Sequence, residues 1–151
     1  MTSFRFKLDP VVELRQRRDD EAQRALAQAE RRIRDAERRL EAATVQLSAA
    51  YEAATEAELK HQDACHLGWH RNWIVVKTRH VEARRLEVQE CRDMLDAASR
   101  LARDARVALR VLERLRERKR QAFDRDQAHH DMLAIDELAS LRAARRLGDT
   151  L

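Results

Sequence analysis

The sequence has very few of the residues that break helices or build a globular core. Its 151 residues include two glycines, Gly68 and Gly148, and one proline, Pro10, and aromatic residues make up only 4%. A compact domain needs turns, and turns are usually marked by clusters of Gly, Pro, Asn and Asp. Such clusters are absent from this chain. This scarcity argues against a compact globular fold.

Other absences exclude whole classes of function. No apolar stretch approaches the ~20 residues that a membrane-spanning helix needs, and the N-terminus lacks the apolar core of a secretory signal. The two cysteines, Cys65 and Cys91, provide no disulfide framework and fit a reducing compartment. There is no Gly-rich phosphate loop and no Ser or Cys in a nucleophile context. We therefore expect a cytoplasmic, non-enzymatic protein that uses no metal or cofactor.

What the chain has in abundance is charge and alanine. Charged residues make up 38% of it, with 31 basic against 27 acidic residues. Abundant charge with few aromatics also describes disordered chains, but here the two signs are mixed and the apolar positions recur regularly. Richness in Ala, Glu, Leu and Arg with almost no breakers is typical of long helices and coiled coils.

Two long helices are predicted, separated near Gly68. Asp9 is a suitable N-cap and Pro10 fits a first helical turn, so the first helix is expected at about 10–67. A tip at about 66–72 then leads into a second helix at about 73–147. In both halves apolar residues recur in steps of four and three, the a/d pattern of a coiled coil. The main seam positions are Leu26, Ile33, Leu40, Leu47, Val88, Leu95 and Leu109.

The two helices are predicted to pair antiparallel as a single hairpin over residues 1–151. Folding about residue 69 places Leu47 opposite Cys91 and Leu40 opposite Ala98, so large residues face small ones. The register stays open by one heptad, because a shift of seven residues preserves much of this matching. The expected fold class is all-α, an antiparallel coiled-coil hairpin. A parallel dimer of one very long helix is the alternative.

Three surfaces of this hairpin are candidates for partner contact. Trp69 and Trp73 either cap the hairpin end or form an exposed docking patch. The run 100–120 holds nine basic and three acidic residues. It suits an acidic protein ring or groove better than nucleic acid, because leucines and not base-stacking aromatics interleave it, and a solvated face is the third interpretation. In the tail of the second helix, apolar spacing continues at Met132, Ile135, Leu138 and Leu141, and no segment of the first helix matches it.

A group of histidines near the predicted tip is weighed as a metal site. His66 and His70 have a spacing that can chelate a metal on one helical face. Gly68 lies between them, and no second Cys–His set exists, so a solvated polar tip is the preferred interpretation. We therefore predict no metal site from the group, which comprises His61, Cys65, His66 and His70, nor from the pair His129 and His130.

The two ends of the chain carry motifs that resemble the FliJ family of flagellar type III export and its virulence-secretion relatives. One is the opening Phe4-Arg5-Phe6-Lys7-Leu8-Asp9-Pro10-Val11, followed by Leu14 and Arg15. The others are Leu112-Glu113-Arg114-Leu115-Arg116-Glu117-Arg118 and the closing Ile135-Asp136-Glu137-Leu138-Ala139. The likeness covers nearly the whole length, whereas the tip matches no pattern of the family.

This resemblance implies a central stalk for the export machinery. Proteins of the family insert their paired termini into a hexameric export ATPase, stimulate it, link it to the membrane-embedded export gate and handle escort chaperones. It implies a monomeric hairpin that is associated peripherally with the inner membrane. No nucleic-acid partner is expected, because the basic run 100–120 lacks interleaved aromatics and is interrupted by acidic residues. The implied ATPase contacts are Phe6, Leu8, Leu14, Arg15, Leu112, Leu115, Arg116 and Arg118. Trp69 and Trp73 are assigned to the gate side on their chemistry alone. A virulence-type stalk or an unrelated coiled-coil adaptor is the alternative.

Overall fold

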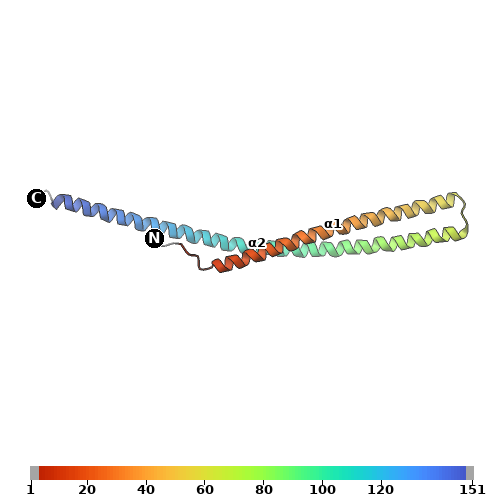
Figure 1. The fold of residues 1–151 in the computed structure, drawn as a ribbon, viewed down its shortest axis with the longest axis horizontal. Coiled ribbons are helices and arrows are strands. Elements are labelled where there is room, and N and C mark those ends of the chain that lie inside the picture. Colours follow the sequence, from red (N-terminus) through yellow and green to blue (C-terminus); the bar gives the residue numbers. More distant parts are fainter. Residues whose placement is uncertain (1–3, 149–151) are drawn as a thin grey trace. The chain divides into compact units, whose positions relative to one another are not determined.

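A computed structural model describes residues 4–148, which form two long helices joined by a short turn (Figure 1). Helix α1 spans Asp9–Leu59 and helix α2 spans Ala64–Gly148, and no strand occurs in the described residues. The predicted all-α hairpin is confirmed. The chain divides into two units, which are described separately. We call residues 18–105 the hairpin unit, and residues 4–17 with 106–148 the terminal unit.

Within the hairpin unit, α1 and α2 run antiparallel and bury a narrow apolar seam between them. Its centre is a cluster of Ile33, Ala36, Val88 and Cys91, against which Leu40 and Leu95 pack. The steps of three and four between buried positions are those of a coiled coil, and alanine at every second layer lets the backbones approach closely. The predicted seam is thus buried or half-buried at Leu26, Ile33, Leu40, Leu47, Val88 and Leu95.

Polar contacts that cross the seam fix its register. Arg39 forms an ion pair with Glu87, which Arg84 also contacts at 2.6 Å, and Lys77 Nζ donates to Gln46 Oε1 at 2.8 Å. Cys91 consequently packs near Ile33, not opposite Leu47. The register obtained by folding the sequence about residue 69 is therefore wrong, by more than the single heptad left open, because the turn comes earlier in the chain.

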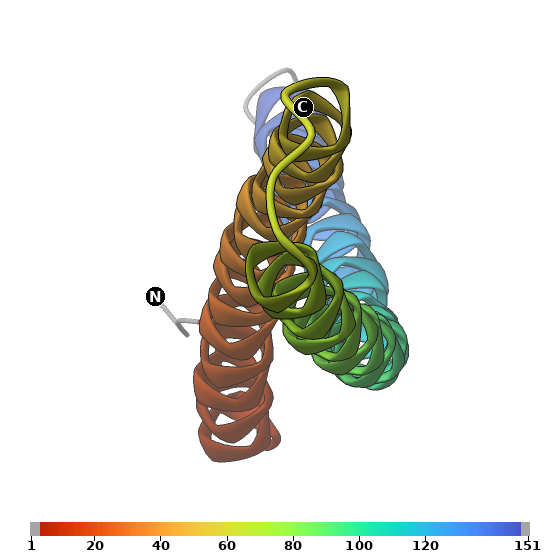
Figure 2. The same ribbon diagram turned by 90° about the vertical axis from the view of Figure 1, so that its right-hand side faces the viewer.

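The turn occupies residues 60–63, between the ends of the two helices (Figure 2). The N–H of Gln62 donates to the carbonyl of Ala57 at 3.2 Å, and that of His61 donates to the carbonyl of Glu58 at 3.0 Å. This pair of hydrogen bonds is a Schellman motif, with His61 at φ 53° in the left-handed position that glycine usually takes. The predicted tip at 66–72 and the predicted end of helix 1 at 67 are wrong, since no glycine marks the turn.

Helix α2 begins with a side-chain cap. Asp63 Oδ1 accepts a hydrogen bond from the backbone N–H of His66 at 2.9 Å and lies 2.9 Å from Nδ1 of the same residue. The backbone N–H of His66, and then its ring, hold the pKa of Asp63 below its ordinary value. Gly68 lies inside α2, where a Cβ would meet no heavy atom within 4 Å. A helical glycine costs only about 1 kcal/mol, so the helix continues through it.

In the terminal unit, residues 4–8 lead into α1. The carbonyl of Leu8 accepts from the N–H groups of Val11 and Val12 at 2.9 and 3.0 Å, so Leu8 and not Asp9 is the N-cap residue. Asp9 and Pro10 are the first helical residues. The carboxylate of Asp9 still favours the helix, because it lies at the positive end of the helix dipole.

The C-terminal part of α2 has a different environment. From Ala128 to Arg142 every side chain is exposed, including those of Met132, Ile135 and Leu138. Neither helix of the described chain has a stretch that is apolar and long enough to span a membrane.

Candidate functional site

The N-terminal segment is fastened to α2 by three phenylalanines. Phe6 is only 7% exposed and forms a buried cluster with Val12 and Leu109. Phe4 packs against this cluster, and its ring centroid lies 5.7 Å from that of Phe123. Burying a phenylalanine contributes about 1.5–3 kcal/mol. Aromatic packing therefore holds residues 4–12 on α2 within the terminal unit.

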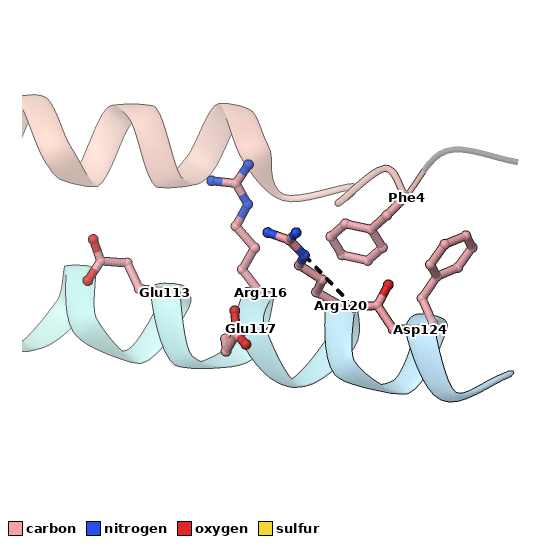
Figure 3. Close-up of a pocket in the computed structure, with 7 residues that line it drawn as sticks. Phe4, Glu113, Arg116, Glu117, Arg120 and Asp124 are labelled. Carbon is pink, nitrogen blue, oxygen red and sulfur yellow. Dashed lines mark ion pairs between the residues drawn. The ribbon is translucent and has the colours of Figure 1, made fainter. Parts of the chain in front are cut away.

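An ion pair reinforces this attachment. Arg116 Nε of α2 lies 3.3 Å from Asp9 Oδ1, at the start of α1, and the two form an ion pair without a hydrogen bond. Figure 3 shows Arg116 reaching from α2 toward the first turn of α1, with Phe4 beside Arg120 and Asp124. The groove between the two segments is lined by Phe4, Glu113, Arg116, Glu117, Arg120, Phe123 and Asp124. Its rim thus mixes arginines with carboxylates around an aromatic wall.

A second, more apolar groove also borders the N-terminal segment. It is lined by Phe4, Arg5, Phe6, Lys7, Leu8, Leu115, Lys119 and Phe123. Cationic side chains therefore border a cleft whose walls are aromatic and aliphatic. Such a cleft suits an apolar side chain that is presented by an acidic protein surface.

The residues assigned to ATPase contact from the family resemblance fall into two groups. Phe6 is buried and Leu112 packs against its cluster, so both stabilise the terminal unit itself. The others present surface: Arg15 is half-buried, and Leu8, Leu14, Leu115, Arg116 and Arg118 are exposed. The structure thus brings all eight into one unit: Phe6 and Leu112 pack inside it, the others present surface, and Arg116 does both, because it also pairs with Asp9.

Trp69 and Trp73 form a separate surface on the hairpin unit. Their rings stack with centroids 5.8 Å apart and an interplanar angle of 11°, and they stay 59% and 39% exposed. Lys77 Nζ lies 4.5 Å from the Trp73 centroid. Both indoles lie along α2, after its first turn, and so they do not cover the end of the hairpin.

A shallow groove beside these indoles has an alanine floor supplied by α1. Its lining comprises Gln46, Ala49, Ala50, Ala53, Trp69, His70, Trp73 and Lys77. The Nδ1 atom of His70 is buried there and has no hydrogen-bond partner among the described residues. Stacked, half-exposed indoles beside a groove are the features of an interface hot spot.

The histidine group near the turn has no metal-binding geometry in the described chain. His66 lies against Asp63, and His70 contacts the edge of Trp69 with centroids 5.0 Å apart. Within residues 4–148, no three His, Cys, Asp or Glu residues gather closely enough to hold a metal ion.

Sequence reasoning missed the contacts that build the terminal unit. The chain has three phenylalanines, Phe4 and Phe6 near one end and Phe123 toward the other, and this distribution was the available signal that the N-terminal segment packs on α2. The Arg116–Asp9 pair had no such signal, because Asp9 was interpreted as a cap.

One comparison with known proteins gives a match. A family model described as "Flagellar FliJ protein" matches residues 4–148. No curated protein and no solved structure matches the chain. The match covers both units, including the opening and closing segments that carry the resemblance noted in the sequence.

Proposed function

Because this chain belongs to the FliJ family and is therefore a component of the flagellar export apparatus, we propose that it acts as the non-enzymatic central stalk of that apparatus. The terminal unit enters the ring of the hexameric export ATPase and stimulates ATP hydrolysis. The hairpin unit then extends to the export gate at the membrane and contacts escort chaperones. The flagellar family favours this system over a virulence-type one.

The observation that carries the proposal is the construction of the terminal unit. Phe6, Leu109 and Arg116 hold the N-terminal segment on α2, so this segment and residues 109–123 of α2 present one surface and not two independent ones. A preorganised surface loses less conformational entropy when it binds. Leu8, Leu14 and Leu115 remain exposed on it and can enter apolar sites of a ring.

Charge supports the same role. The exposed cations of α2 in this unit include Arg114, Arg118 and Lys119. Positive charge on a surface that enters a protein ring speeds association with acidic walls and selects against basic ones. The apolar groove beside Lys119 adds a pocket at the same place.

The gate-side contact is assigned to the groove of Trp69 and Trp73. It lies in the hairpin unit, so two partners can be bound through separate units. Tryptophans contribute strongly to binding when a partner desolvates them. W69A/W73A is therefore expected to lose gate binding and to retain ATPase binding.

Binding of the purified export ATPase to the immobilised full chain tests the proposal. We expect R114E/R118E to weaken this binding at least tenfold, and R24E/R31E, which makes the same change of charge on exposed residues of the hairpin unit, to leave it unaltered. Circular dichroism confirms that each variant is folded. Equal binding by both variants would contradict an ATPase contact through the terminal unit and favour a structural adaptor without this partner.

A further inference from the structure

The C-terminal part of α2 carries an apolar stripe that nothing in the described chain covers. Met132, Ile135, Leu138 and Leu141 are 56–64% exposed. A helix with such a stripe gains stability chiefly when an apolar surface packs on it.

The charges on this face are arranged symmetrically about its centre. Asp131, Ile135, Leu138 and Arg142 follow one another at spacings of four, three and four, which place them on one side of the helix. The order therefore runs acid, branched apolar, branched apolar, base. When the helix is turned end to end, Arg142 takes the place of Asp131, and Leu138 takes the place of Ile135.

We propose that this face pairs with the same face of a second copy of the chain, antiparallel and about a two-fold axis. Asp131 then lies opposite Arg142 of the second copy, and Ile135 lies opposite its Leu138. Each contact occurs twice, as in any isologous interface. Met132 and Leu141 lie within the same turns, one on each flank of this face, and widen its apolar centre.

Charge complementarity selects this occupant over others. An unrelated apolar helix would cover Ile135 and Leu138 but would leave Asp131 and Arg142 without matched partners. A parallel copy would place Asp131 against Asp131 and Arg142 against Arg142, which is repulsive. Only an antiparallel copy gives both Asp131 and Arg142 a partner of opposite charge.

The interface is short, so the dimer is expected to be weak and reversible. It comprises about three helical turns and a few apolar side chains on each copy, well below the area of a standard stable interface. We expect a dissociation constant on the order of tens of micromolar. Because the charged pairs are exposed, raising the salt concentration should weaken the dimer.

Sedimentation equilibrium of the full chain under reducing conditions, up to several hundred micromolar, tests the proposal. Wild type should show monomer and dimer. D131R and R142D each place like charges opposite one another twice, and each should raise the dissociation constant about tenfold or more. The double swap D131R/R142D restores opposite charges and should restore the dimer.

A matched pair of leucine variants separates this face from the rest of the helix. L138E should abolish the dimer, whereas L133E, at an exposed leucine on the opposite side of α2, should leave it intact. All these side chains are exposed, so helix content by circular dichroism should not change. A monomer at every concentration, failure of the double swap to restore association, or an equal effect of L133E would overturn the proposal.

This self-association does not rest on the ATPase proposal. The two use different residues, 131–142 for the second copy and the exposed residues near 114–118 for the ring. L138E should therefore retain ATPase binding while losing the dimer, and R114E/R118E should do the reverse. The same sedimentation measurement tests the monomeric hairpin expected from the sequence: a dimer would contradict it, and a monomer at every concentration would support it.

Discussion

Ile33 of α1 packs against Val88 of α2 in the centre of the hairpin seam, and both side chains are less than a tenth exposed. Truncation of Ile33 to alanine deletes buried methylene and methyl groups between two closely spaced backbones. We expect I33A to lower the free energy of unfolding by about 2–5 kcal/mol, measured by urea denaturation.

The matched control for that variant is L101A. Leu101 also lies on a seam-forming helix but is 66% exposed. Its truncation should change the free energy of unfolding by less than about 0.5 kcal/mol. Similar losses for the two variants would mean that the Ile33 seam is not the core of the hairpin.

His61 adopts the left-handed backbone conformation at the Schellman motif that ends α1. Any residue with a Cβ is strained there and glycine is not. We expect H61G to raise the free energy of unfolding by about 1 kcal/mol in chemical denaturation. Q62G, one position later and without a positive φ, should lower it. Destabilisation by H61G would show that the turn is not formed in this way.

The cap at Asp63 makes a pH-dependent contribution to stability. Its pKa is lowered in the folded chain, so its stabilising effect is present above its ordinary pKa and is lost as the pH falls below about 4. Asparagine caps helices nearly as well but does not titrate. The stability difference between wild type and D63N, measured by thermal denaturation, should therefore be larger at pH 5 than at pH 3.

D63A completes this comparison, because it removes the cap at both values of pH and should be less stable than D63N throughout. An equal difference between wild type and D63N at the two values of pH would rule out a contribution from the Asp63 carboxylate.

Phe6 is assigned here to the packing of the terminal unit and not to direct contact with a partner. F6A should therefore release residues 4–12 from α2, which hydrogen exchange would detect as faster exchange of these amides. L14A, at a half-exposed leucine of the same unit, should leave their exchange unaltered. If F6A lost ATPase binding without any change in exchange, Phe6 would be a contact residue after all.

The all-α coiled coil was predictable from the sequence because the buried face of each helix follows from periodicity. The positions Ile33, Leu40, Val88 and Leu95 recur in steps that leave one possible buried face, and the structure buries that face. The turn was not predictable in the same way. Glycine is the usual sign of a helix end, yet here His61 takes the left-handed position while Gly68 lies inside α2.

The predicted register was wrong because it was derived from the predicted position of the turn. Alanine and leucine alternate in both halves of the chain, so many registers match equally well, and only long-range pairs such as Arg39–Glu87 distinguish them. The construction of the terminal unit was not predictable from the sequence, because a motif does not show that Phe6 is buried while Arg116 and Arg118 are exposed.

Stimulation of ATP hydrolysis tests the central claim most directly. The rate of hydrolysis by the purified flagellar export ATPase is measured alone, with the wild-type chain, and with R114E/R118E or R24E/R31E. Wild type and R24E/R31E should raise the rate, and R114E/R118E should not. A hydrolysis rate that the wild-type chain leaves unchanged would contradict its proposed role as the stalk of the export ATPase.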